Sequence, residues 1–193
     1  HPAKGLEAIL NIYNVSLGLA VLFLARILGL LYIINSVESE SLVVQTRKHL
    51  ISNTILFLVF FLLFAFRLIL KDGYSYNPDS MKVAIEPLKY FHNLIQMPLV
   101  LLLFLAGVIA VLWGIFIAWK SESTKGIWFT GGGTILVVFS LMLIAGYNNT
   151  CYYPSNYDLQ SSLNIQNSSS SRFTLTTMSY VSLLVPFVLA YIW

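Results

Sequence analysis

The sequence predicts an all-α membrane protein with about five transmembrane helices, and two observations carry this prediction. Of the 193 residues, 58% are hydrophobic and only 10% are charged, whereas a soluble domain carries about 25% charged residues. The apolar residues also gather into five segments that meet or approach the roughly 20 residues needed to cross a bilayer core about 30 Å thick. So few charges cannot cover a water-facing surface, so the chain belongs in lipid.

The predicted spans follow one another with short or polar connections. The first contains a single charge, Arg26, and the second ends near Arg67. Turn chemistry follows at residues 71–73 and 77–79. We expect the first four spans to form a four-helix bundle and the fifth to be one further helix, within one domain over residues 1–193. The five predicted spans are 8–34, 50–70, 94–119, 127–146 and 174–193.

Two connections between the predicted spans differ from simple short turns. Residues 81–91 mix apolar and basic side chains, and this pattern predicts a short helix in the membrane interface. Residues 147–173 form a long polar loop, and connections of that length are usually functional or disordered. Tyrosines gather at its start, as is typical of a segment leaving the membrane.

The basic residues predict the orientation of the spans. Loops 35–49 and 120–126 face the same side, and the positive-inside rule counts short loops near helix ends. We therefore expect both loops to be cytoplasmic and loop 147–173 to be periplasmic. The cations that carry this expectation are Arg47, Lys48, Lys120 and Lys125.

Two arginines within the spans are candidate functional residues. Membrane arginines are costly and often functional, so Arg26 either has a functional role, snorkels to the interface, or pairs with a neighbouring helix. Arg67 is closer to the end of its span, which favours snorkelling. His49 and His92 are predicted at helix starts and Met142 within a span. They are the residue types that ligate haem, but ligation requires an apolar pocket and the pattern favours solvation or packing.

Small residues and prolines carry structural signals. Ala106, Ala110, Gly114 and Ala118 form a stripe at four-residue spacing, which lets two helix backbones approach closely, and the glycines 131–133 can do the same. Pro98 falls in the first turn of a predicted span, and Pro186 is predicted to kink the last one.

The sequence offers no self-contained active site. No Asp or Glu lies well inside a predicted span, so a proton relay of the usual membrane type is not expected. One cysteine, Cys151, excludes an intrachain disulfide, and Ser-His-Asp, HExxH and phosphate-loop patterns are missing. The net charge of +3 resides in loops, so a nucleic-acid partner is not expected. We therefore predict no catalytic, cofactor-binding or metal-binding residues.

The tail carries a more specific pattern, which includes Pro154-Ser155 and a serine run over residues 168–171. The pattern has two further parts, which are residues 161–163 and the apolar stretch 185–191, Val-Pro-Phe-Val-Leu-Ala-Tyr. This tail resembles the C-terminal signature of subunit II of the cytochrome bd type quinol oxidases. Because the chain starts at His1 and stops inside an apolar run, we expect it to be a piece of a larger polypeptide, the second half of a two-bundle subunit.

The resemblance implies a role for the chain. The family's complex sits in the bacterial inner membrane, oxidises quinol and reduces dioxygen to water. Subunit I holds haem b and haem d, and subunit II supports it without chemistry of its own. The implied partners are subunit I, membrane lipid and the N-terminal half of the same subunit, with a structural quinone or lipid bound in some members. The family topology also places the short loops in the cytoplasm and the Pro-Ser loop outside.

Two other interpretations remain open at this point. The chain is alternatively a fragment of a membrane transporter or channel, in which Arg26 and a kinked last helix line the path, although no inverted repeat supports it. It is otherwise a scaffold or assembly protein without turnover.

Overall fold

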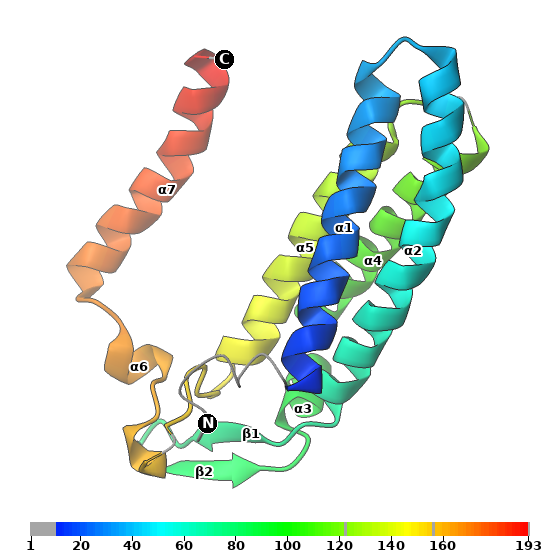
Figure 1. The fold of residues 1–193 in the computed structure, drawn as a ribbon. Helices are drawn as coiled ribbons and strands as arrows, with labels where there is room; N and C mark the ends of the chain where they lie inside the picture. The colour runs from blue at the N-terminus through cyan, green and yellow to red at the C-terminus, as the bar shows by residue number, and fades with distance from the viewer. Residues whose placement is uncertain (1–10, 122, 156, 193) are drawn as a thin grey trace.

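Four long helices form an up-down-up-down bundle, and a fifth stands apart from it (Figure 1). The computed structural model describes residues 11–121, 123–155 and 157–192. Within these ranges five helices are long and apolar enough to cross a membrane. The predicted all-α membrane fold is therefore confirmed. The five helices are α1 (Ile12–Ser36), α2 (Glu40–Ile69), α4 (Pro98–Lys120), α5 (Gly126–Gly146) and α7 (Arg172–Ile192).

Buried positions in the bundle repeat at alternating intervals of four and three residues. This 3.5-residue period is the pattern of helices that cross at a small left-handed angle, because it keeps one seam facing the neighbour. The repeat is unbroken on α5, where the buried residues are Gly126, Thr130, Gly133, Val137, Ser140 and Ile144. The core between the helices is apolar, and its most deeply buried members include Ile27, Leu31 and Leu50.

Glycines set the close approach of α4 and α5. A Cβ added at Gly114 would lie 2.4 Å from Thr130 Oγ1 and 2.6 Å from the carbonyl oxygen of Gly126. The stripe predicted on α4 is only half correct, since Ala106 is exposed and Gly107 is buried in its place. A strict spacing of four residues turns about 40° too far at each step, so it drifts out of the seam.

α2 begins ten residues before its predicted span, so the connection to α1 is residues 37–39 and not 35–49. Ser39 occupies the N-cap position, and Glu40 lies in the first turn, where a negative charge suits the helix dipole. Thr46 and Leu50 are both buried and continue the packing of α2 on α1. The predicted start was late because hydropathy detects only the apolar part of a helix. A helix that extends past the membrane is longer than that part.

The third predicted span, 94–119, is two helices. α3 (Lys89–Gln96) ends at Met97, whose backbone leaves the helical region, and α4 then starts at Pro98. A proline disfavours helical backbone at the residue before it and suits the first position of a helix. Residues 94–96 therefore belong to α3, which caps the end of the bundle.

A small sheet replaces most of the interfacial helix expected over residues 81–91. β1 (Gly73–Tyr76) pairs antiparallel with β2 (Val83–Glu86), and the turn between them contains Met81 at a positive φ of 56°. Leu88, at φ 52°, ends the strand segment and caps α3. The helical prediction failed because alternation over four residues is too short to outweigh the composition of the stretch.

In the segment expected as a long loop, residues 147–173, the described residues include two stretches that pair with this sheet. Residues 149–151 run along the free edge of β1, with Cys151 N donating to Tyr74 O at 2.7 Å. The side chain of Gln160 pairs with the other edge, because its amide both accepts from and donates to the backbone of Val83, at 2.9 and 3.0 Å. Two short helices complete the segment, the 3-10 helix η2 (Leu159–Ser161) and α6 (Ile165–Ser168).

Candidate functional site: the surfaces left for partners

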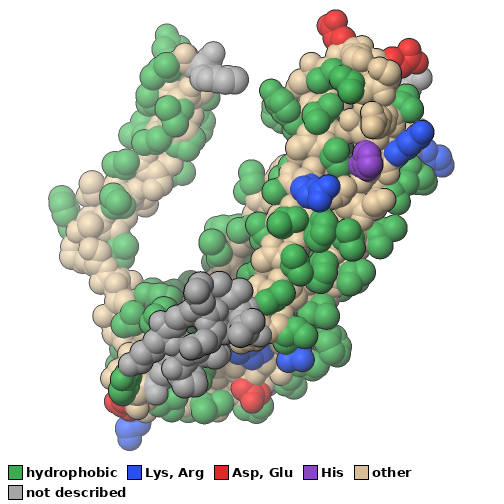
Figure 2. All heavy atoms as spheres, in the orientation of Figure 1, with side chains coloured by type: hydrophobic (Ala, Val, Ile, Leu, Met, Phe, Trp, Pro, Cys, Tyr) green, Lys and Arg blue, Asp and Glu red, His purple; other side chains and the backbone are tan. Residues whose placement is uncertain are grey.

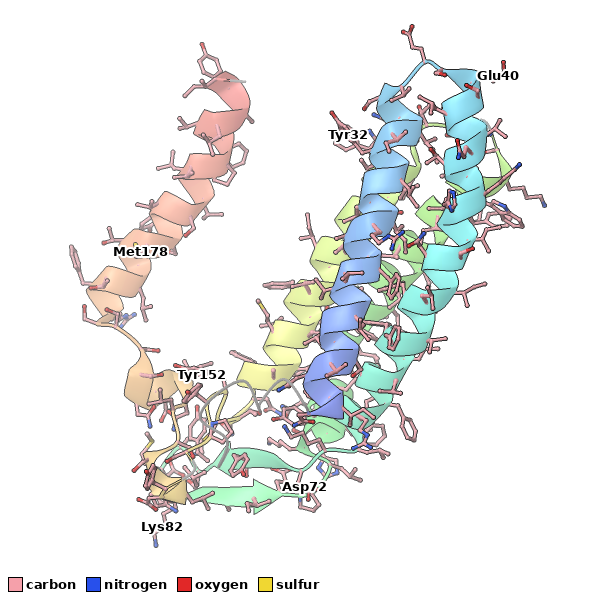
Figure 3. The ribbon with its side chains drawn as sticks, in the orientation of Figure 1. Tyr32, Glu40, Asp72, Lys82, Tyr152 and Met178 are labelled. Atoms are coloured by element: carbon pink, nitrogen blue, oxygen red, sulfur yellow. The ribbon has the colours of Figure 1, made fainter. Side chains whose placement is uncertain are left out.

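α7 is the largest surface that the chain leaves uncovered. No residue of α7 is buried, although its side chains are mostly apolar, and Phe187 and Tyr191 are 76% and 93% exposed. Figure 1 shows α7 separated from the bundle, and Figure 3 shows Met178 on this separate helix. An isolated apolar helix of this length fits lipid and neighbouring membrane helices. No described part of the chain therefore covers α7.

Several hydroxyl side chains of α7 form hydrogen bonds within the helix. The hydroxyls of Thr176, Thr177 and Ser182 each donate to the backbone carbonyl four residues earlier, at 2.7 to 3.0 Å. Pro186 lies inside α7, where it removes one backbone donor. The kink expected there stays a prediction.

Arg26 lies on the outward side of α1. Its neighbour Ile27 is fully buried against the bundle, whereas Arg26 is exposed and makes no ion pair with any described residue. A Cβ on Gly126 would lie 3.4 Å from Leu31, so Arg26 sits about five residues, or roughly 7 Å, below the start of α5. The two structural alternatives, snorkelling and pairing with another chain, are both compatible with that depth.

The predicted haem-ligand candidates do not converge. His49 is exposed on the side of α2, in the tenth position of the helix, and Met142 is 69% exposed on α5. His92 lies at the opposite end of the bundle, on α3. The described residues contain no group of three His, Cys, Asp or Glu side chains placed to hold a metal ion. A metal contact from His49 or Met142 would need further ligands from another chain.

A charged cluster forms where β2 meets α3. Glu86 accepts from Lys89 Nζ and from His92 Nδ1, both at 3.0 Å. Burial acts to raise the pKa of Glu86, but the hydrogen bonds from His92 and Lys89 outweigh it and leave this pKa below its ordinary value. The Lys89 side chain is only 6% exposed, so the carboxylate neutralises a buried ammonium. The pattern of residues 81–91 predicts an interfacial position for this stretch, but it does not reveal the pairing of Glu86.

A second polar cluster ties α3 to the end of α5. Asn93 is fully buried and donates to Thr150 Oγ1 and to the carbonyl of Ile144, at 2.8 and 2.9 Å. Asn148 in turn donates to Asn93 Oδ1 at 3.1 Å and to Gln96 Oε1 at 2.6 Å. This network was not predicted from the sequence. Its only signal is the Asn148-Asn149 pair, since both residues adopt the positive φ that asparagine tolerates.

Together these two clusters fix the base from which α7 leaves. Tyr152 OH and Ser168 Oγ are hydrogen-bonded at 2.5 Å, which holds α6 against the loop, and Figure 3 shows Tyr152 beside this short helix.

Charged side chains gather near the two ends of the bundle, while the middle of the visible face is green and tan (Figure 2). This architecture defines a multi-pass membrane subunit, with a self-packed bundle and an uncovered helix for partners.

The comparison with known families identifies that subunit. A family model described as cytochrome bd terminal oxidase subunit II matches residues 2–193, so the chain belongs to this family. No curated protein sequence matches the chain. Membership makes the chain a subunit of an oxidoreductase complex in which partner subunits carry the haems, and implies a complex with subunit I. Its five apolar helices agree with a multi-pass protein of the inner membrane.

Proposed function

We propose that this chain is a non-catalytic part of subunit II of a bd-type oxidase that oxidises quinol and reduces dioxygen to water. In this proposal the chain supports the haem-bearing subunit I, which binds haem b and haem d, and it contributes no residue to the chemistry. The observation that carries the proposal is α7, an apolar helix of 21 residues with no buried side chain. Together with membership of the subunit II family, it indicates a chain shaped to pack against other membrane helices.

The bundle and α7 have different tasks in this proposal. The bundle has its own apolar core, so it provides the rigid part. α7 packs against membrane helices outside this chain, in subunit I or in the N-terminal half of subunit II. Membership of the subunit II family supports this placement, because it implies a complex with subunit I.

The charges support an orientation. Arg47, Lys48, Lys120 and Lys125 all lie toward the end of the bundle opposite the small sheet. We propose that this end faces the cytoplasm and that residues 147–173 face the periplasm, in agreement with the positive-inside rule. Family membership favours this oxidase role over the transporter alternative.

Purification of the tagged full-length subunit from its native membrane tests the proposal. We expect subunit I to co-purify and the pure complex to show the absorbance bands of haem b and haem d, with quinol-dependent oxygen uptake. Oxygen uptake should be lost when subunit I is removed, because the chemistry belongs to that subunit. A pure complex without haem bands, or haem bound by this chain after subunit I has been removed, would contradict it.

A further inference from the structure

A cavity opens at the periplasmic end of the α1–α2 pair in the proposed orientation. It measures about 660 Å³ and combines polar and apolar walls. α1 contributes its first turn, and α2 contributes its last turn together with the residues just after it. The lining residues are Asn11, Tyr13, Asn14, Phe66, Arg67, Leu70 and Lys71.

Two cations face this cavity without a carboxylate partner among the described residues. Arg67 lies in the last turn of α2 and Lys71 just after the helix ends, and both line the cavity. The ion pairs of the described residues involve only Glu86 with Lys89 and His92, and Asp72 next to Lys71 is not paired with it. The two positive charges therefore have no negative counterpart within the described part of the chain.

The wall positions these charges. The Tyr13 ring packs at 5.0 Å from the ring of Phe64, which fixes it between α1 and α2. Lys71 Nζ lies 5.1 Å from the centroid of the same Tyr13 ring, so a cation–π contact holds the ammonium at the cavity. Arg67 therefore lines the same cavity as a second cation whose position is fixed, and snorkelling of Arg67 alone does not account for this shared position.

We propose that this cavity binds the phosphate of an anionic membrane phospholipid. Arg67 and Lys71 would contact the phosphate oxygens, because cationic donors form strong charge-assisted hydrogen bonds with phosphate. The acyl chains would run down the outside of α2, where Phe66 and Leu70 are 66% and 53% exposed. This apolar continuation favours a lipid over free phosphate, which would leave that part of the cavity unused. The inference depends on the membrane location of the chain and goes beyond its role in the oxidase.

The experiment measures lipid retained by the purified oxidase complex, using native mass spectrometry. The test variant is the double substitution R67Q/K71Q, and the matched control is K120Q/K125Q, which removes two cations from the opposite end. We expect one tightly held phospholipid in the wild type and the control, and roughly tenfold weaker retention in the test variant. Equal retention in all three proteins, or none in the wild type, would overturn the site.

A second measurement separates lipid from phosphate. The complex is stripped of lipid with detergent, and its thermal stability is followed after adding phosphatidylglycerol in mixed micelles or inorganic phosphate. We expect phosphatidylglycerol to raise the midpoint of the wild type but not of R67Q/K71Q, and phosphate to have no effect. Restoration by inorganic phosphate would overturn the lipid assignment. Haem content, recorded on the same samples, reports separately on the oxidase role.

Discussion

The α4–α5 hairpin and α7 are both made of apolar helices of similar length, yet one is fully specified by this chain and the other is not. Between α4 and α5, glycine faces glycine at Gly107–Gly133 and Gly114–Gly126, so close that no Cβ would fit. α7 has no buried residue. Since lipid is as apolar as leucine, apolar composition alone gives helices no reason to associate, and shape decides. The difference teaches that small residues in heptad register, rather than hydrophobicity, mark a partner within the chain.

The largest effect is expected from breaking the close seam. Gly114→Leu would force its side chain into Thr130 and the backbone of Gly126, and relieving that overlap should separate the hairpin at a cost above about 3 kcal/mol. We expect assembled oxidase, measured by haem absorbance in membranes, to be nearly lost. The control Gly132→Leu adds the same side chain where nothing lies within 4 Å, and should assemble normally. Similar yields from both variants would show that the seam does not determine the fold.

A smaller effect should follow from trimming α7. The pairs Leu183→Ala/Phe187→Ala and Leu184→Ala/Val188→Ala remove exposed apolar volume from two faces of the helix. If one face packs on a partner, at least one pair should weaken the complex by about 2 kcal/mol, measured as loss of subunit I on detergent challenge.

The matched control for α7 is Ile109→Ala/Ile135→Ala. These two side chains are 66% and 70% exposed on the outside of the bundle, so their truncation removes comparable volume from the other region. Should neither α7 pair weaken the complex more than this control, α7 would face only lipid.

The next largest effect is expected from the polar cluster that ties α3 to the end of α5. Asn93→Ala leaves the buried carbonyl of Ile144 and the side chain of Thr150 without their donor, and we expect about 2 kcal/mol of destabilisation in thermal unfolding of the complex. Gln96→Ala removes only the exposed end of the same network and should cost less than about 0.5 kcal/mol. If the two variants have the same melting temperature, the network does not stabilise the folded complex.

The smallest effect is a dependence on pH. Because the pKa of Glu86 is lowered in the folded state, its contribution to stability is present above the ordinary value of 4.5 and is lost as the pH falls through the lowered value. The difference in melting temperature between wild type and Glu86→Gln should therefore shrink below about pH 4.5. Glu40→Gln, at the opposite end of the bundle, serves as the control. A gap that widens on acidification would contradict the assigned sign.

Residue patterns predicted the membrane class and the five long helices, because hydropathy and length are directly visible in a sequence. They also placed Pro98 at a helix start and Gly114 in a seam. The seam partner Gly107 was missed because its register depends on where α5 lies. Lys89 lies only three residues from Glu86, but its burial depends on how β2 meets α3. Asn93 was missed for a reason related to that of Gly107, since its partner Thr150 is distant in the sequence and reaches it through the pairing of Thr150 with β1. Interactions between distant segments have no local signature.

The inward bonding of the hydroxyls on α7 has a consequence for biogenesis. Because the hydroxyls of Thr176, Thr177 and Ser182 bond to carbonyls of α7 itself, they lower the cost of placing this helix in the bilayer before a partner helix covers it. Insertion of the last span and its capture by the rest of the oxidase can then be separate events in time. The newly made subunit can thus persist in the membrane until haem-bearing subunit I is available. Its synthesis then does not depend on the supply of haem at that moment.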